Sequence, residues 1–281
     1  MGLFDTAAQK LADLEARVAA LEGATEPIVY EPSATHILKT GDAVERKSFT
    51  DLTYGILGHS NSGGVAINGA AIRDCLITRC PDGIKIGSGP QSSGITIERV
   101  QVVDSAAPLF VANISDSTFT DLTLDGRPTN GYDHCVYAER GLLRCTFRNI
   151  RMTRGGGYCL HLYNGAYNGS NGSEDLLFED CVLDARGGGA RALVIYPGYK
   201  RVTLRRCKLL SDRTDQPIIS MYGATDILIE DFEAEGGYSL IEVPSSGACS
   251  NVIFRNGTYP AGPPLIYGPT TGITFANVVR V

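Results

Sequence analysis

The stretch Phe119-Thr-Asp-Leu-Thr-Leu124 opens with a four-residue phrase that recurs along the chain. The phrase is a large apolar residue, any residue, then Asp, Asn or Arg, then usually another apolar residue. Its ten copies are Phe49-Thr-Asp-Leu52, Ile72-Arg-Asp-Cys75, Ile97-Glu-Arg-Val100, Phe119-Thr-Asp-Leu122, Phe147-Arg-Asn-Ile150, Phe178-Glu-Asp-Cys181, Leu204-Arg-Arg-Cys207, Ile229-Glu-Asp-Phe232, Phe254-Arg-Asn-Gly257 and Phe275-Ala-Asn-Val278. Successive copies are 23, 25, 22, 28, 31, 26, 25, 25 and 21 residues apart. A period near 25 residues indicates a repeat architecture.

Apolar and polar residues alternate around each copy, as in 95–102 and 202–209, which is typical of a β-strand. A second short strand follows each copy, at 83–86, 135–137, 160–163, 193–196, 218–222 and 265–267. Two or three strands per turn predict an all-β fold, a right-handed single-stranded parallel β-helix of about ten coils over residues 49–281. Leucine-rich repeats share the period, but their leucine-and-asparagine frame is absent.

Three columns of side chains follow from this repeat. The fourth phrase position, which includes Cys75, Cys181 and Cys207, is predicted to point inward. The third position is polar in every copy and predicts a bend at which Asp and Asn bond local backbone; ten copies do not make the local cluster that catalysis needs. The second strands carry a column of tyrosines, predicted either to stack structurally or to form a sugar-binding ridge: Tyr137, Tyr163, Tyr196, Tyr222 and Tyr267.

Residues 3–22 follow a different period. Their apolar residues are spaced three and four apart, as in a heptad repeat: Phe4, Ala7, Leu11, Leu14, Val18 and Leu21. Lys10 with Glu15, and Arg17 with Glu22, are placed to attract each other between parallel helices. We therefore expect a trimeric coiled coil over 1–23 and a linker with an N-terminal cap over 24–48. A dimer, or one amphipathic helix packed on its own domain, remains an alternative.

Composition narrows the function. No apolar run in the 281 residues is long enough to span a membrane, and a net charge of −6 argues against a nucleic-acid partner. The eight cysteines contain no C-x-x-C pair, which predicts buried free thiols. Four scattered histidines and no nucleotide-binding motif predict no metal and no cofactor.

The two longest repeat intervals, 28 and 31 residues, carry insertions within residues 125–175, and we expect any ligand to bind there because solenoid insertions form surface loops. The candidate catalytic residues are Asp133, Glu139, His161, Glu174 and Asp175. The candidate substrate-binding residues are Tyr132, His134, Arg154, Tyr163 and Tyr167. Paired carboxylates suit a glycosidase, and histidine with arginine suits a lyase. Alternatively, Asp133 and Asp175 are turn residues, and His161 is an outward strand residue.

A short coiled coil followed by repeats such as 119–124 and 147–152 resembles a bacteriophage tail spike or minor tail protein with a pectate-lyase-like β-helix. The resemblance implies a homotrimer in the virion tail that contacts a host surface glycan and other tail proteins, without nucleic acid or membrane insertion. A large head-binding region and a separate carboxy-terminal trimerisation domain are not seen, which favours binding over catalysis. A polysaccharide lyase, glycoside hydrolase or epimerase, or a bacterial surface β-helix, is the alternative.

Overall fold

The computed structural model describes residues 28–59, 65–87, 89–164, 172–188, 191–259 and 262–280. The predicted coiled coil over 1–23 lies outside these ranges. Every regular element within them is a β-strand, which confirms the all-β prediction for this part of the chain. No helix there is long and apolar enough to cross a membrane.

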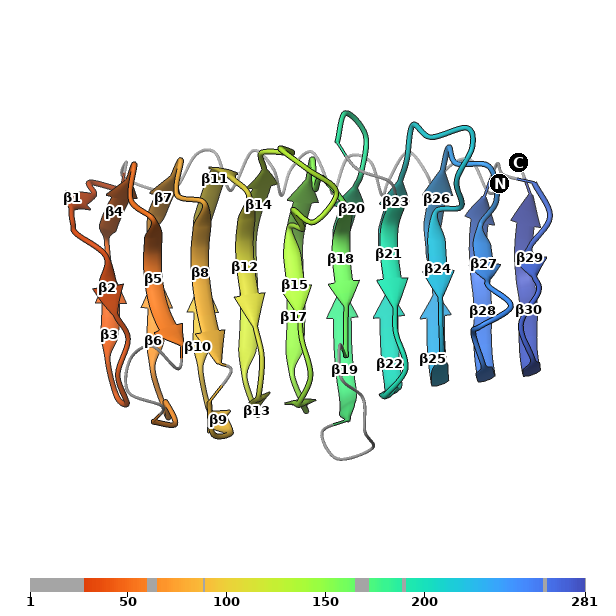
Figure 1. Ribbon diagram of the computed structural model, residues 1–281, viewed down its shortest axis with the longest axis horizontal. Helices are drawn as coiled ribbons and strands as arrows, with labels where there is room; N and C mark the ends of the chain where they lie inside the picture. The colour runs from red at the N-terminus through yellow and green to blue at the C-terminus, as the bar shows by residue number, and fades with distance from the viewer. Residues whose placement is uncertain are drawn as a thin grey trace, which may run out of the picture. The chain divides into compact units, whose positions relative to one another are not determined.

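The strands form a parallel β-solenoid of about nine turns, in which successive turns stand side by side in chain order (Figure 1). One sheet, here sheet B, takes one strand from each turn. Its strands are β2 (His36–Ile37), β5 (Tyr54–His59), β8 (Asp82–Gly87), β12 (Ala107–Val111), β15 (Val136–Ala138), β18 (Tyr158–Leu162), β21 (Arg191–Ile195), β24 (Ile219–Met221), β27 (Ile241–Val243) and β29 (Leu265–Ile266). The second strands expected from the sequence lie in this sheet.

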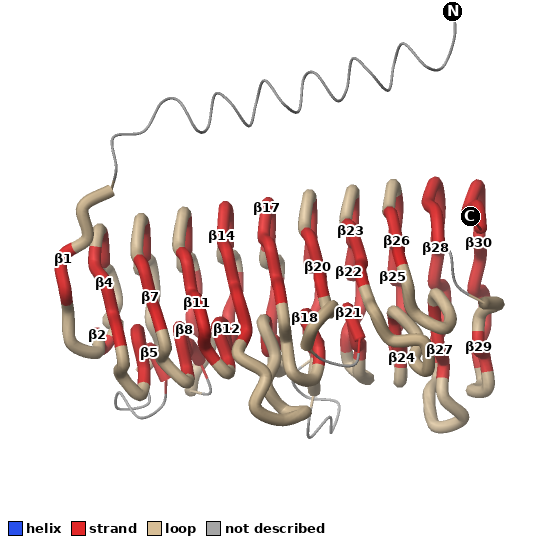
Figure 2. The backbone as a smooth tube through the Cα atoms, turned by 90° about the horizontal axis from the view of Figure 1, so that it is seen from above, coloured by secondary structure: helices blue, strands red, loops and turns tan. Residues whose placement is uncertain are grey.

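The other sheet, here sheet A, contains the phrase and forms the opposite row of strands in Figure 2. One ladder of this sheet, in which every strand except β3 contains the start of a copy of the phrase, consists of β3 (Ala43–Glu45), β6 (Ala71–Arg73), β10 (Thr96–Glu98), β14 (Thr118–Gly126), β17 (Thr146–Thr153), β19 (Ser173–Glu179), β22 (Tyr199–Arg205), β25 (Ala224–Glu230), β28 (Cys249–Tyr259) and β30 (Thr270–Arg280). After the bend come β1 (Glu31–Pro32), β4 (Lys47–Thr50), β7 (Leu76–Thr78), β11 (Gln101–Ser105), β20 (Val182–Asp184), β23 (Lys208–Leu210) and β26 (Glu233–Glu235). Before the phrase lie β9 (Ser92–Ser93), β13 (Ile114–Ser115) and β16 (Leu142–Leu143).

The third phrase position makes the bend. In all ten copies this residue has a φ between 51° and 56°, the left-handed region that Asn and Asp tolerate better than most residues. Arg99 therefore splits the single strand expected at 95–102 into β10 and β11. The side chains also bond one another between turns: Arg99 Nε donates to Asp74 Oδ1 at 2.7 Å, and Asn149 Nδ2 donates to Asp121 Oδ1 at 2.6 Å.

Register corrects the first copy of the phrase. Ile72 and Phe275 belong to one column that runs without interruption through nine copies. Phe49, however, pairs with Ile77, while Val44 pairs with Ile72. The first copy therefore lies in the neighbouring ladder. The two ladders look alike in sequence because each ends at a left-handed residue of its own, Arg46 after Val44 and Asp51 after Phe49. Strand β1 pairs with β4, β2 with β5 and β3 with β6, so residues 31–48 of the segment expected to be a linker and cap already contain strands of the solenoid.

Stacked apolar columns fill the interior. Phe147 lies face to face between Phe119 and Phe178, with ring centroids 4.5 and 4.6 Å apart. All eight cysteines are buried and free, as the sequence predicted, and burial raises the pKa of Cys145 to about 11. Gly257 replaces a larger residue of the inward column because the Phe232 ring from the preceding turn occupies the space of a side chain there.

Candidate functional site

The outward face of sheet B carries the candidate site. His161 pairs with Tyr137 in the preceding turn and with Val194 in the following one. The column continues to Phe110 on one side and through Ser220 to Glu242 on the other. Leu160 and Leu162, which flank His161, are fully buried in the solenoid, so strand alternation directs the histidine to the opposite face.

A second outward column begins two residues later and contains the predicted tyrosine ridge. The backbone N–H of Tyr163, Tyr196 and Tyr222 each donates to the preceding turn, at 2.8, 2.9 and 2.8 Å, so these three share one register. Tyr137 is offset, since it pairs with His161. Tyr137 lies inside β15, whereas Tyr163, Tyr196 and Tyr222 directly follow the last residues of β18, β21 and β24.

Rings from four successive turns make continuous contact. We call them the aromatic cluster: His134, Tyr137, Tyr158, His161, Tyr163, Tyr196 and Tyr222. His161 lies at its centre, with its ring centroid 4.3 Å from that of His134 and 4.9 Å from that of Tyr158. Tyr196 and Tyr222 stack at 4.7 Å with an interplanar angle of 10°. The predicted stacking of the ridge is confirmed for these four turns.

Both histidines of the cluster are uncharged at neutral pH. Burial lowers the pKa of His134 to about 4, and burial together with His134 lowers the pKa of His161 to about 2. His134 Nδ1 accepts the Tyr158 backbone N–H at 3.1 Å, which leaves its proton on Nε2. Burial also raises the pKa of Tyr196 to about 12, so the phenol keeps its proton.

Unpaired polar atoms gather in the same turns. Seven buried side-chain nitrogen or oxygen atoms lack a hydrogen-bond partner in the described part of the chain, and five of them belong to His161, Asn164, Arg191 and Gln216. These residues lie in or beside β18, β21 and β24. Buried polar groups are normally paired, and each exception calls for an explanation. One explanation is that a polar ligand completes the hydrogen bonds.

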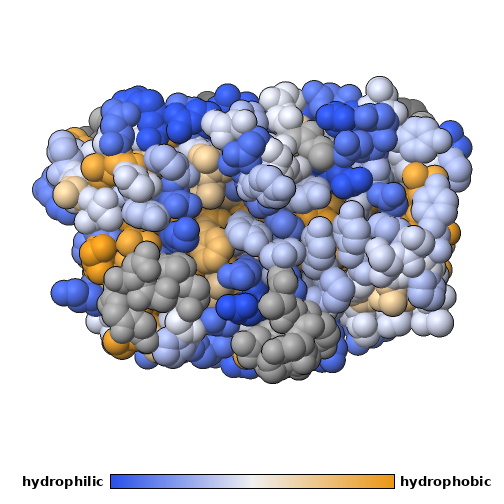
Figure 3. Space-filling view, viewed as in Figure 1, coloured by the Kyte–Doolittle hydropathy of each residue, from blue (hydrophilic) through white to orange (hydrophobic). Residues whose placement is uncertain are grey.

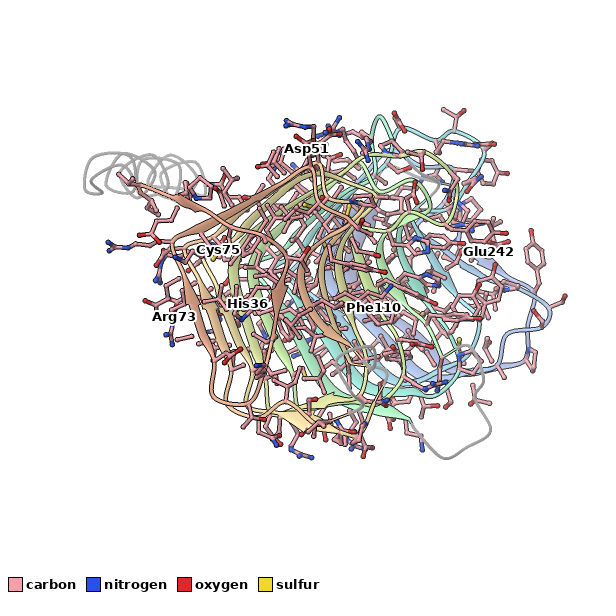
Figure 4. All side chains as sticks on the ribbon, turned by 60° about the vertical axis from the view of Figure 1, so that its left-hand side comes forward. His36, Asp51, Arg73, Cys75, Phe110 and Glu242 are labelled. Carbon is pink, nitrogen blue, oxygen red and sulfur yellow. The ribbon has the colours of Figure 1, made fainter. Side chains whose placement is uncertain are left out.

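Charged groups on this face occur as pairs. Arg191 Nη2 lies 3.3 Å from Glu242 Oε2, and Lys85 Nζ lies 3.5 Å from Asp82 Oδ2. Figure 4 shows Glu242 on the side of the solenoid opposite to Arg73 of sheet A. In Figure 3, which views the face of sheet B, hydrophobic residues appear along the middle and hydrophilic residues along the upper edge.

The structure brings four of the predicted site residues together. His134 and His161 belong to the cluster, and so does Tyr163. Glu139 follows β15 and stands beside Tyr163 in the adjacent turn, because Ala138 pairs with Leu162. Sequence reasoning left Tyr158 out of the site. Its signal was the three-residue spacing to His161, repeated between His134 and Tyr137 in the turn before.

The first insertion positions other candidates outside the cluster. Asp133 accepts hydrogen bonds from Thr129 Oγ1 at 2.6 Å and from the backbone N–H of Thr129 and Asn130 at 2.7 and 3.0 Å. Its carboxylate therefore holds a turn, which is the alternative the sequence left open. Tyr132 is 88% exposed. Tyr167 lies outside the described residues.

The remaining candidates lie in or beside sheet A. Arg201 contacts Glu174 at 2.7 Å and Asp175 at 2.6 Å, and this ion pair lowers the pKa of Asp175. Arg154, at the bend after β17, donates from Nε to Asp125 Oδ1 at 2.8 Å. These groups bridge neighbouring turns and are not in the aromatic cluster. No group of three or more metal-ligating side chains occurs among the residues that the structure describes.

No protein-family model matches this chain, and no curated protein matches it. Solved structures do resemble it. One is ORF18 of Geobacillus virus E2, with a TM-score of 0.58 and 12% identity over 89% of this chain and 53% of that one. Another is the A-module of the Azotobacter vinelandii mannuronan C-5 epimerase AlgE6, with a TM-score of 0.53 and 11% identity over 88% of this chain and 80% of that one.

A third is the tailspike protein gp49 of the Acinetobacter baumannii bacteriophage Fri1, a capsular polysaccharide depolymerase, with a TM-score of 0.38 and 12% identity over 87% of this chain and 48% of that one. The similar structures thus include a protein of a virus and the tail spike of a bacteriophage. The chain spans about half the length of the Geobacillus virus protein. At these identities the likeness shows the parallel β-solenoid fold.

Proposed function

We propose that this protein is a phage tail-spike-like element that binds a polysaccharide of the bacterial surface along the aromatic cluster of sheet B. The observation that carries the proposal is the coincidence of the ring ladder with five unpaired polar atoms. Tyrosine faces pack against the C–H face of a sugar ring, as they do against other apolar surfaces. The unpaired nitrogen and oxygen atoms then serve the sugar hydroxyls.

The viral setting is supported by the fold and by the heptads. The structure with the TM-score of 0.58 comes from a virus of Geobacillus, and the heptads at 4–21 favour three parallel chains. We place the protein in the virion tail as a homotrimer that contacts the host glycan and other tail proteins. Light scattering of the full chain tests the trimer: a mass of one 30.0 kDa chain at micromolar concentration contradicts it.

The positions of the carboxylates favour binding without cleavage. Glycosidases hold two carboxyl groups within about 10 Å of each other. Glu139 and Glu242 flank the cluster four turns apart, which is about 19 Å at roughly 4.8 Å per turn. Asp133 is engaged by its own turn. A pKa of about 4 for His134 also makes it a poor general base at neutral pH.

A polysaccharide lyase is the second candidate. Neutral His161 lies against Tyr158, with ring centroids 4.9 Å apart, and its ring nitrogens have no hydrogen-bond partner; an imidazole that accepts a proton beside a phenol that donates one is an acid–base pair. Cleavage of the bound polysaccharide would produce new reducing ends, whichever enzyme class performs it. A reducing-end assay on each bound polysaccharide separates enzyme from binder, and we expect no new ends.

An array of purified bacterial surface polysaccharides tests the binding site. We expect Tyr196→Ala and Tyr222→Ala each to weaken binding about tenfold, because one ring contact is worth about 0.5–1.5 kcal/mol and the two rings also shape each other. Tyr238→Ala is the matched control, since Tyr238 is 52% exposed and outside the cluster.

Tyr132→Ala tests the first insertion alone, and circular dichroism checks that each variant is folded. Unchanged binding by Tyr196→Ala and Tyr222→Ala would reject the cluster as the site. Loss of binding on Tyr132→Ala alone would move the site to the insertion.

A further inference from the structure

We infer that the polysaccharide bound on sheet B is electrically neutral, made of uncharged sugars and free of uronic acid or phosphate groups. The inference rests on the proposed function and specifies its substrate class. It comes from the balance of charge on this face and from the kind of polar atoms left unpaired there.

Every charged side chain within the described strands of sheet B has an opposite charge beside it. Four such residues occur in β5 through β29: Asp82 with Lys85, and Arg191 with Glu242. Lys85 is further engaged over the Phe110 ring, 5.3 Å from its centroid. A carboxylate on a sugar would thus meet no cation that is free of an acidic partner in these strands.

One acidic residue that flanks the cluster is paired in the same way. Glu139, which follows β15, lies 3.9 Å from Arg140, measured between Oε1 and Nη1. The sequence intervals 60–64, 88, 165–171 and 189–190, which the structure does not describe, contain only Ser, Asn, Gly, Ala and Tyr. These four intervals therefore add no positive charge, whereas residues 1–27, which the structure also does not describe, contain Lys10 and Arg17.

The unpaired atoms match hydroxyl groups. Neutral His161 offers one donor and one acceptor, and neither ring nitrogen has a partner. Asn164 Nδ2 and Arg191 Nε are unpaired donors, and Gln216 Oε1 is an unpaired acceptor. A sugar hydroxyl both donates and accepts, whereas a carboxylate only accepts. A mixed set of donors and acceptors therefore suits a chain of hydroxyl groups.

The cost of desolvation makes the preference for neutral over acidic polysaccharides strong. A carboxylate that leaves water without a partner loses far more solvation free energy than a hydroxyl does. Seating it beside Arg191 would require the guanidinium to leave Glu242, which would then be unpaired in turn. An acidic polymer pays this penalty at each charged sugar in contact.

The polysaccharide array also tests the charge class. We expect the bound polysaccharides to have neutral repeating units, and their affinity to change less than about twofold between low and high salt, because no ion pair forms. Each acidic polysaccharide is paired with its carboxyl-reduced form, which keeps the linkages and removes the charge. We expect the reduced form to bind at least about tenfold tighter than its parent.

Glu242→Gln sharpens the test, because it leaves the Arg191 charge without its partner. We expect the ratio of acidic to neutral affinity to rise about fivefold, the worth of one partly exposed ion pair. Glu45→Gln is the matched control: it removes the same charge from Arg73 on sheet A, where Nη1 and Oε1 are 3.2 Å apart.

Binding of acidic polysaccharides in preference to their reduced forms would overturn the neutral substrate class while the proposed function stands. An unchanged ratio for Glu242→Gln would also overturn it. An array on which no polysaccharide binds would reject the proposed function itself.

Discussion

The outward faces of the two sheets are built on opposite chemistry. On sheet A, one outward column of side chains alternates in sign from turn to turn, with an uncharged Thr120 in the middle and an uncharged Ala276 at the end: Glu45, Arg73, Glu98, Thr120, Arg148, Glu179, Arg205, Glu230, Arg255 and Ala276. On sheet B, the corresponding outward columns carry rings and unpaired polar atoms. The charged column of sheet A is paired between turns, whereas five of the seven unpaired buried atoms of the described residues lie in or beside sheet B.

This difference suggests that the outward face of sheet A stabilises the fold and that the outward face of sheet B binds the ligand. Glu230 accepts Arg205 Nε and Arg255 Nε at 2.7 Å each, from the turns on either side, and its side chain is 5% exposed. A slip in register would place like charges together, so the ladder specifies which turns pair. The aromatic cluster has no such alternation and is free to meet a ligand. Changes on sheet A should therefore affect stability, and changes on sheet B should affect binding.

The largest effect is expected in the interior that both sheets share. Phe147→Ala removes a ring stacked on both sides and should lower the free energy of unfolding by about 3–5 kcal/mol, because a cavity replaces it. Chemical denaturation measures the change. Phe147→Leu is the milder control. A loss under about 1 kcal/mol for the alanine variant would mean that the stack contributes little to either sheet.

A charge reversal on sheet A tests how much the column of alternating charges contributes to stability. Glu230→Lys places a third cation between two arginines and should lower the free energy of unfolding by about 2–3 kcal/mol, less than for a fully buried pair because both arginines are partly exposed. Polysaccharide binding of the folded variant should not change. Glu233→Lys, at a 53% exposed site, is the control and should stay within about 1 kcal/mol. Lost binding by folded Glu230→Lys would break the separation between the sheets.

Acid should weaken the solenoid through sheet B first. A buried histidine whose pKa lies below its unfolded value of about 6.5 contributes stability that is fully present above that pH and is lost as the pH falls. With the folded pKa of His134 at about 4 and that of His161 at about 2, each should lose about 2 kcal/mol between pH 7 and pH 5. The carboxylates of sheet A, whose pKa values are lowered, contribute until the pH falls further.

Denaturation curves at pH 7 and pH 5 measure this loss. His161→Phe should show about half of the pH dependence of the wild-type protein, since one titrating group is gone. It should also bind polysaccharide more weakly, because the unpaired ring nitrogens are removed. Equal pH dependence in the variant and the wild-type protein would place the titration elsewhere.

The smallest effect concerns the thiols, which lie between the sheets and face neither surface. All eight cysteines are buried and free, so alkylation of the native protein should be slow and should not alter binding. Denatured protein should gain eight additions by mass spectrometry. Mass evidence for disulfides would contradict the free thiols and would indicate an oxidising compartment.

Much of the fold followed from local patterns. The phrase located sheet A, the short apolar segments located sheet B, and the polar third position marked the bends. These features repeat in every turn, so ten imperfect copies reinforce one another. The copy at Phe49 was assigned to the wrong ladder, because both ladders place a polar left-handed residue two positions after an inward apolar one.

The site was less readable because it depends on how each turn closes. Glu174 and Asp175 follow His161 closely in the chain, yet they bond Arg201 on sheet A. Tyr196 and Tyr222 are distant in sequence, yet they stack in the cluster. The sequence shows which residues are close along the chain. The lengths of the loops decide which residues become neighbours in adjacent turns.

The sequence by itself determined the parallel β-solenoid, its bends and its buried columns, because alternation along a strand decides which side chains point inward. Only the tertiary structure decided that His161 faces Tyr137, that its ring nitrogens lack partners, and that Arg191 is held by Glu242. Those relations arise between turns about 25 residues apart, where register depends on every loop in between. The period of a repeat can be read from the sequence, but the register between neighbouring turns is known only from the structure.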